Sequence, residues 1–186
     1  MRRILLLSLV FMLALGMTVL TGCGGTKEQV MEVVTYEGEK EKVRISLSYP
    51  ETDQYRWSTN QEDFGTTTDN AVLIGKDFKI AIQFTDISQR FNSEFEVFRA
   101  SRTASYESLE EVSYGGINGF TYYYEQFSAY IVQLPIPHDP TQVLTLYVYT
   151  KAGDEEGTTA IFSRDEIQQI LDTVKIEPLQ NEPSAD

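Results

Sequence analysis

The chain has few of the residues from which most catalytic and metal sites are built. Its 186 residues include one cysteine, Cys23, one histidine, His138, and one tryptophan, Trp57. A single cysteine excludes an internal disulfide, a paired-cysteine redox site and a multi-cysteine zinc site. A single histidine also disfavours metal sites built from histidine and cysteine. We therefore expect no metal of this kind and no cofactor.

Basic residues are also scarce. The chain holds 15 Lys and Arg against 28 Asp and Glu, which gives a net charge of −13 at pH 7. Binding to a phosphate backbone needs clustered Lys and Arg and draws much of its energy from released counterions, so we exclude nucleic acid as a partner. Hydrophobic residues at 41% and charged residues at 23% exclude a disordered, collagenous or multi-span membrane protein.

The long apolar run is confined to the start of the chain. Arg2 and Arg3 precede residues 4–15, which are apolar at every position except Ser8. A positive start followed by an apolar run is typical of an export signal. The alternative is an uncleaved membrane helix over residues 4–20. This stretch lies at the short limit of the roughly 17 to 25 residues that cross a bilayer, so it is the poorer fit.

The apolar run ends in Leu-Thr-Gly-Cys, residues 20–23, which resembles the lipobox of bacterial lipoproteins. The resemblance implies cleavage after residue 22 and a diacylglyceryl group on the thiol of Cys23, whose acyl chains hold the protein in the membrane. We therefore expect a protein of the bacterial cell envelope, anchored by lipid on the extracytoplasmic side. We expect a signal peptide, a lipidated tether, one α+β domain and a disordered tail, over residues 1–22, 23–29, 30–180 and 181–186 respectively.

Alternation of apolar and polar residues predicts most of the strands. Residues 43–49 alternate with a period of two, as a half-buried strand does. Residues 71–74 and 78–84 are predicted to form a hairpin. Three later segments predict a meander of strands, residues 120–125, 129–134 and 143–150. The polar loop over residues 51–70 contains Trp57, and a loop of this length is usually functional or locally packed.

Two helices are expected, over residues 93–104 and 163–174. Both segments begin with the Ser-x-x-Glu pattern of a capping box, at Ser93 and at Ser163. The second segment carries an apolar stripe at helical spacing, formed by Ile167, Ile170, Leu171 and Val174. Strands grouped around two separated helices indicate an α+β fold with a mostly antiparallel sheet flanked by helices.

The order of these elements resembles the PsbP-like α/β/α sandwich. The resemblance rests on a strand that ends in Tyr49 and Pro50, on the nearby Trp57, and on a phenylalanine-rich helix. A Tyr-Gly-Gly-Ile-Asn-Gly-Phe turn at residues 114–120, a strand meander and the closing helix then follow. Photosystem extrinsic subunits, a eukaryotic Ran-binding adaptor and many bacterial lipoproteins have this fold. The resemblance implies a module that binds a protein partner, and it supplies no catalytic residues.

Catalytic motifs are absent from the sequence. It contains no Gly-x-Ser-x-Gly elbow, no His-Glu-x-x-His and no phosphate-binding Gly-Lys-Ser/Thr. His138 could act as a base oriented by Asp139, but it lies between nearby prolines, and a solvated turn residue is the favoured interpretation. The alternative function is a cell-envelope hydrolase that acts on glycan or cell-wall substrate. It would need two convergent ionisable groups with perturbed pKa values in one cleft.

A glycine-bounded acidic segment offers oxygen ligands for calcium. Asp154, Glu155 and Glu156 lie between Gly153 and Gly157. The alternating Asp and Asn spacing of a calcium loop is missing, so a solvated hairpin tip is favoured.

Aromatic residues are abundant, with 11 tyrosines and 10 phenylalanines. Tyr123, Tyr147 and Tyr149 share strand parity, which predicts that they lie on one sheet face. Together with the Trp57 loop they are our candidate partner-binding residues, because tyrosine combines apolar area with a polar tip. The alternative is that a helix covers them. The partners expected are therefore the membrane, through the lipid on Cys23, and an unidentified envelope protein or ligand.

Overall fold

The computed structural model describes most of the chain after the first 24 residues. The described ranges are residues 25–33, 43–64, 70–92, 94–106, 108–137 and 139–178. The predicted export signal, Cys23, Ser93, His138 and the predicted tail lie outside the described residues, and the predictions made for them stay predictions.

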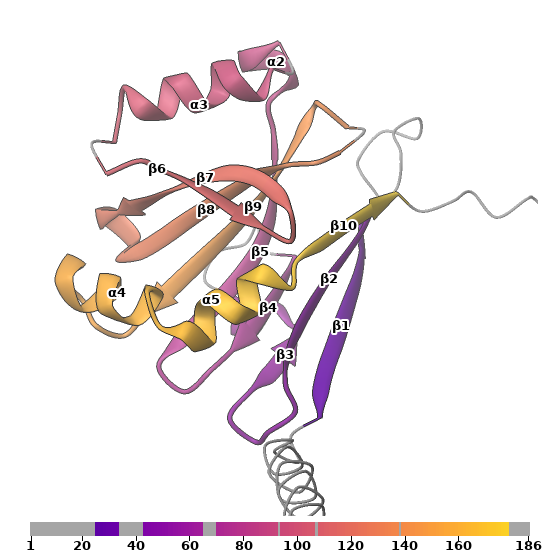
Figure 1. Cartoon of the computed structure of the whole chain (residues 1–186), viewed down its shortest axis with the longest axis vertical. Coiled ribbons are helices and arrows are strands. Elements are labelled where there is room, and N and C mark those ends of the chain that lie inside the picture. Colours follow the sequence, from indigo (N-terminus) through magenta and orange to yellow (C-terminus); the bar gives the residue numbers. More distant parts are fainter. Residues whose placement is uncertain are drawn as a thin grey trace, which may run out of the picture.

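A seven-stranded antiparallel sheet forms the middle of the protein (Figure 1), and it confirms the predicted α+β class. The order of strands across this large sheet is β3-β4-β5-β9-β8-β7-β6. The bounds are β3 (Arg56–Ser58), β4 (Ala71–Ile74), β5 (Phe78–Asp86), β6 (Glu110–Tyr114), β7 (Ile117–Tyr124), β8 (Ala129–Pro135) and β9 (Gln142–Thr150). The predicted hairpin is β4 and β5, and the predicted meander is β7, β8 and β9.

A second sheet of three strands has the order β1-β2-β10. Its strands are β1 (Thr26–Val33), β2 (Val43–Pro50) and β10 (Lys175–Pro178). The predicted tether over residues 23–29 is wrong from Thr26 onward, because β1 begins there and pairs with β2. The backbone N–H of Glu51 also donates to the carbonyl of Gly25 at 2.8 Å. Gly25 and Thr26 are therefore part of the folded domain.

Helices cover both faces of the large sheet, as Figure 1 shows. The helices are α2 (Ser88–Phe91), α3 (Phe95–Thr103), α4 (Glu155–Phe162) and α5 (Asp165–Asp172), with short 3-10 turns η1 (Gln61–Asp63) and η2 (Glu125–Phe127). The larger core lies between the sheet, α4, α5 and β2. The apolar stripe predicted for the closing helix, Ile167, Ile170, Leu171 and Val174, is buried in this core.

A smaller aromatic core lies on the opposite face, beneath α2 and α3. Phe98 of α3 is fully buried, and its ring lies 5.1 Å from that of Phe91 and 5.9 Å from that of Phe120, measured between centroids. The phenylalanine-rich helix α3 therefore turns Phe95 and Phe98 toward the sheet.

The helix caps differ from the prediction. The N-cap residues of α3 and α5 are Glu94 and Arg164, and neither forms a side-chain capping hydrogen bond. Ser163 instead ends α4, a helix that the sequence analysis missed. Only two residues separate α4 from α5. Ser163 is the C-cap of α4, so the N-cap of α5 falls on the next residue, Arg164.

The turn at residues 114–120 is the hairpin between β6 and β7. Tyr114 pairs with Ile117, so Gly115 and Gly116 form a two-residue loop with φ values of +58° and +78°. Such loops favour glycine. A Cβ atom on Gly115 would overlap the carbonyl of Val174, so this hairpin lies directly against the end of α5.

The described part of the loop after Pro50 is locally packed. Arg56 donates two hydrogen bonds to the Asp63 carboxylate, each at 2.7 Å, and the Ser58 hydroxyl donates a third at 2.6 Å. Lys79 of β5 donates to the Asp63 carbonyl at 3.1 Å. The hydrogen bonds from Arg56 and Ser58 hold the pKa of Asp63 well below its usual value. The packed interpretation of this loop is therefore supported over residues 51–64.

Candidate functional site

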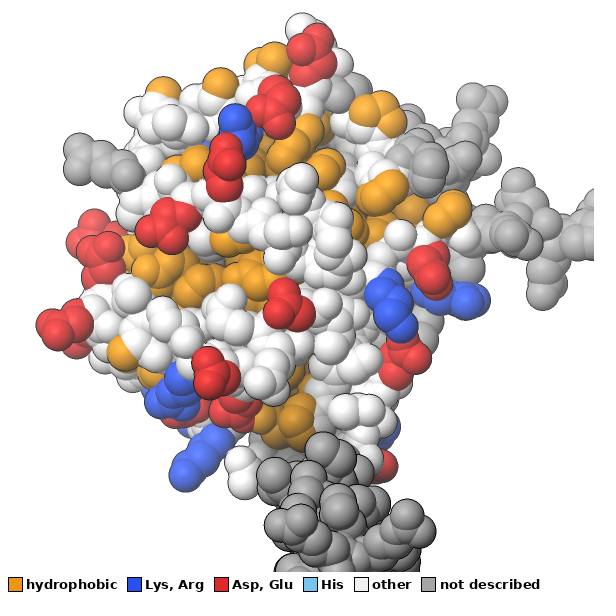
Figure 2. All heavy atoms as spheres, viewed as in Figure 1, with side chains coloured by type: hydrophobic (Ala, Val, Ile, Leu, Met, Phe, Trp, Pro, Cys, Tyr) orange, Lys and Arg blue, Asp and Glu red, His pale blue; other side chains and the backbone are white. Residues whose placement is uncertain are grey.

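A cleft of about 1,030 Å³ opens at the rim of the large sheet, where β7 ends. We call it the rim cleft. The segment after α3 forms one wall, the end of β7 and η2 form the floor, and the start of α4 forms the other wall. The side chains that define it are Tyr106, Tyr123, Tyr124, Glu125, Asp154 and Glu155. Figure 2 shows hydrophobic surface bordered by Asp and Glu side chains on this side of the molecule.

The tyrosines of the cleft are held by ring contacts. Tyr106 stacks on Tyr122 with centroids 4.2 Å apart, and its ring meets that of Tyr124 edge-on at 5.9 Å. Tyr124 donates its hydroxyl hydrogen to the Gln126 side chain. Burial raises the pKa of Tyr122 above its usual value, so this supporting phenol is neutral. The cleft therefore offers rings whose positions are already fixed.

Further aromatic rings extend from the cleft across the sheet. Phe127 of η2 lies 5.1 Å from Tyr124, and its ring also lies 6.4 Å from Tyr147 and 6.5 Å from Tyr149. Tyr147 and Tyr149 stack on each other at 5.8 Å. We call Tyr106, Tyr124, Phe127, Tyr147 and Tyr149 the aromatic row. Phe127 is 41% exposed, and among the described residues only Val97 is another large hydrophobic residue with such exposure.

The prediction that Tyr123, Tyr147 and Tyr149 share one face is wrong. Tyr123 lies opposite Tyr130 of β8, which in turn lies opposite Val148 of β9. Directly opposed residues point to the same face, so Tyr123 faces α4 together with Val148. Tyr147 and Tyr149 flank Val148 and face the other way. Parity within each strand cannot set this relation, because it depends on the register between strands.

Trp57 is not part of the same surface. It lies opposite Leu73 of β4, is half-buried and packs against the larger core. Its strand β3 is one edge of the sheet, whereas β7 is next to the other edge. The structure therefore brings Tyr147 and Tyr149 together, places Tyr123 on the opposite face of the sheet, where it lines the rim cleft, and leaves Trp57 at the far edge. Tyr106, Tyr124 and Phe127 join the two β9 tyrosines in the aromatic row and were not predicted from the sequence. Tyr124 ends β7 and the other two lie outside the strands, so strand periodicity does not connect the three residues.

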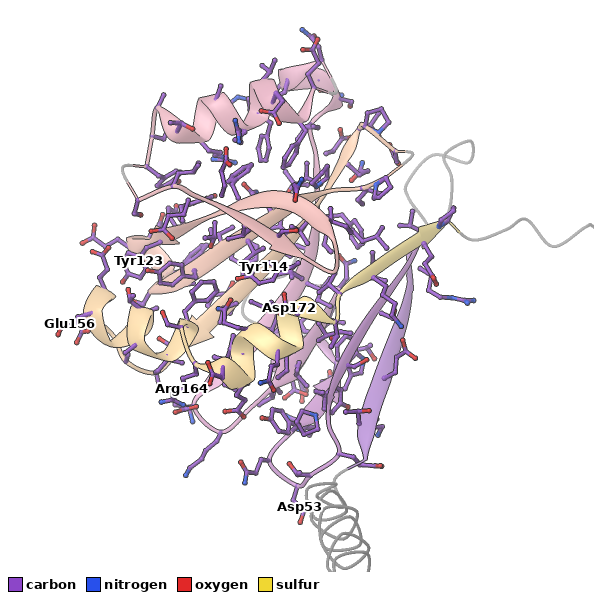
Figure 3. All side chains as sticks on the ribbon, in the orientation of Figure 1. Asp53, Tyr114, Tyr123, Glu156, Arg164 and Asp172 are labelled. Atoms are coloured by element: carbon purple, nitrogen blue, oxygen red, sulfur yellow. The ribbon has the colours of Figure 1, made fainter. Side chains whose placement is uncertain are left out.

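The acidic segment at residues 153–157 begins a helix, so the predicted hairpin tip is wrong. Asp154 is the N-cap of α4, and its carboxylate accepts a hydrogen bond from the Gly157 N–H at 2.7 Å. Glu155 and Glu156 occupy the first turn, where acidic residues are favoured by the helix dipole. Figure 3 shows Tyr123 between the sheet and α4, and Glu156 on the outer side of that helix. Within the part of the chain that the structure describes, no cluster of three or more Asp, Glu, His or Cys could hold a metal ion.

Asp139 stabilises the turn between β8 and β9. Its buried carboxylate accepts hydrogen bonds from the N–H and the hydroxyl of Thr141, and its N–H donates to the Ile136 carbonyl. These bonds close the turn between β8 and β9. Both bonds from Thr141 engage the Oδ1 atom of the carboxylate.

Three side chains with displaced pKa values lie in separate parts of the fold. Asp63 is bound to Arg56 beside β3, and Tyr122 lies beneath Tyr106. Burial raises the pKa of Tyr114 to about 12, and its hydroxyl donates to the Gln168 side chain of α5 at 2.7 Å. These groups do not converge in one cleft as a hydrolase site requires.

In residues 25–33, 43–64, 70–92, 94–106, 108–137 and 139–178, no helix has the length and apolar character needed to span a membrane. Comparison of the chain with protein-family models, with curated proteins and with solved structures gave no match.

Proposed function

We propose that the protein is a lipid-anchored component of the bacterial envelope that acts as a non-catalytic binding or accessory module near the membrane. The aromatic row and the rim cleft form its partner-binding surface in this proposal. The observation that carries it is the aromatic row itself, whose rings are in continuous contact and which has the exposed Phe127 at its centre. Tyrosine and phenylalanine anchors of this kind supply much of the energy of protein interfaces.

The position of Gly25, the first residue that the structure describes, supports a location close to the membrane. Gly25 is already hydrogen-bonded to Glu51, and it follows Cys23 by two residues. Two extended residues span about 7 Å. A lipid on Cys23 would therefore hold the folded domain almost directly against the bilayer.

The resemblance to PsbP-like domains supports partner binding over catalysis. It rests on the order of elements, with a phenylalanine-rich helix before the hairpin at residues 114–120 and a closing helix after the meander. Members of that fold family mostly bind proteins, and we extend this to the present chain as part of the proposal.

Capture of the partner from native membranes tests the aromatic row. The full chain is crosslinked in its own cells, recovered, and compared with Phe127→Ala. Val97→Ala is the matched control, because Val97 is 44% exposed but lies on α3, outside the row. We expect Phe127→Ala to lose most of the captured partner and Val97→Ala to retain it. Equal recovery with both variants would count against the proposed surface.

A further inference from the structure

All the charged side chains that line the rim cleft in the described structure are carboxylates. Glu125 comes from η2, and Asp154 and Glu155 come from the start of α4. All three residues are exposed to solvent, and no Lys or Arg of the described residues lines the cleft. The cleft therefore concentrates part of the negative charge of a chain whose net charge is −13.

These carboxylates are not neutralised within the described structure. The ion pairs there join Arg56 to Asp63, Arg99 to Glu96 and Glu111, Arg164 to Asp77, and Lys175 to Glu28. None of them involves a carboxylate of the cleft. Asp154 accepts the hydrogen bond of its own helix cap, and this leaves its charge in place.

Aromatic rings line the same cleft as the carboxylates. Tyr106 and Tyr124 meet edge to face, and Tyr106 is held from below by Tyr122. A cation near the face of an aromatic ring is attracted by the ring quadrupole. Arginine suits such a site best, because its planar guanidinium stacks on aromatic rings and donates two parallel hydrogen bonds to a carboxylate.

We propose that the rim cleft binds an arginine-bearing segment of the partner protein. This inference rests on the proposed function, and it adds the chemistry of the partner. Charge complementarity between the arginine side chains and Glu125, Asp154 and Glu155 provides attraction, and the fixed tyrosine rings provide the contact area. Because the rings are already in place, little ordering is needed when the segment binds.

Fluorescence anisotropy with labelled peptides tests the inference. The probe is a short Gly and Ser peptide that carries several arginines, and the comparison peptide has glutamine at the same positions. Each is titrated with the full lipid-bearing chain in a neutral detergent, at low and at high salt. We expect the arginine peptide to bind and the glutamine peptide to fail, with weaker binding at high salt because mobile ions screen exposed charges.

A double carboxylate variant and a matched control locate the site. We expect the double variant Glu125→Gln with Asp154→Asn to weaken binding of the arginine peptide by about three- to tenfold, as the loss of exposed charge pairs does. Asparagine caps a helix as well as aspartate, so α4 stays intact. The control is Glu177→Gln, which removes an exposed carboxylate on β10 in the other sheet.

Several results would overturn the inference. They are equal binding of the two peptides, no effect of the double variant, and an equal effect of Glu177→Gln. The crosslinking experiment separates this failure from failure of the proposed function. If Phe127→Ala abolishes partner capture while the arginine peptide does not bind, the binding module stands and the arginine inference falls.

Discussion

The ring of Tyr130 on β8 stacks on that of Phe162 at the end of α4, with centroids 4.2 Å apart and planes within 5° of parallel. The hydroxyl of Tyr130 also lies 2.8 Å from the hydroxyl of Thr159, which precedes Phe162 on α4 by about one helical turn. A single tyrosine thus holds α4 against the sheet at two points. Because α4 begins with Asp154 and Glu155, this contact also sets the position of one wall of the rim cleft.

Loss of the stack should be costly. Phe162 is buried, so Phe162→Ala should lower the free energy of unfolding by about 3–5 kcal/mol through lost contacts and a cavity. Tyr130→Phe keeps the stack and removes only the hydroxyl, which should cost about 1 kcal/mol. Denaturant titration of the full chain measures both. Equal costs would contradict this expectation, because the hydroxyl contact would then stabilise α4 as much as the ring stack does.

The closing helix offers a second comparison of stability. Ile170 is buried against the larger core, so Ile170→Ala should cost about 2–5 kcal/mol. Ser163 is exposed and ends α4 through backbone hydrogen bonds, so Ser163→Ala should change stability by no more than about 0.5 kcal/mol. The same titration distinguishes the two. A cost near 1 kcal/mol for Ser163→Ala would restore the capping role that the sequence pattern predicts.

Sequence periodicity predicted the elements that bury one face. Residues 43–49, 71–74 and 78–84 and the meander all became strands, and the stripe on α5 is buried as expected. Periodicity missed β1 and β10, since the described side chains at the start of β1 are polar and exposed and those of β10 are largely exposed. Their pairing with β2 depends on backbone hydrogen bonds, which leave no pattern of side chains.

The candidate site was harder to predict than the fold. Tyr147 and Tyr149 were placed together correctly because they belong to one strand. Tyr123 was misplaced because η2 and the left-handed Ser128, with φ of 47°, fix the register between β7 and β8. The acidic start of α4 was predicted to be a hairpin tip because Gly153 and Gly157 are typical of turns. The aspartate between these glycines is equally typical of a helix N-cap, and this second signal is the one that the structure follows.

Low pH should remove the contribution that the Asp63 carboxylate makes to the stability of the fold. Its pKa is lowered in the folded protein by hydrogen bonds from Arg56 and Ser58. A lowered folded pKa gives stability that is present above the unfolded pKa of about 3.9 and is lost as the pH falls toward the folded value. The unfolding midpoint of the wild-type chain should therefore fall more steeply below about pH 4 than that of Asp63→Asn. Asp53→Asn, at an exposed turn position, is the control and should keep the wild-type slope.

The lipid assignment predicts a processing defect. Cys23→Ala should abolish metabolic labelling with fatty acid and leave the precursor uncleaved after Gly22, because the thiol is the acceptor in the lipobox chemistry. Thr21→Ala keeps a small residue before the cleavage site and should be labelled and cleaved normally. Both are followed by labelling and by mass measurement of membrane fractions. Continued labelling of Cys23→Ala, or cleavage at Gly22 without the thiol, would contradict the assignment.

A lipid on Cys23 also predicts which end of the domain faces the membrane. Gly25 bonds to Glu51, and Tyr55 of the same turn contacts Tyr49, so the start of β1 and the turn before β3 lie together at one end of the fold (Figure 1). Trp57 follows this turn and is the only tryptophan of the chain, so its fluorescence reports on that end.

In vesicles that contain brominated lipid, Trp57 of the lipid-bearing chain should be strongly quenched. The double variant Trp57→Phe with Phe127→Trp moves the single tryptophan to the aromatic row and should be quenched much less, because η2 lies away from the anchored end. Stronger quenching at position 127 than at position 57 would reverse the orientation. It would also place the aromatic row against the bilayer, where a protein partner could not reach it.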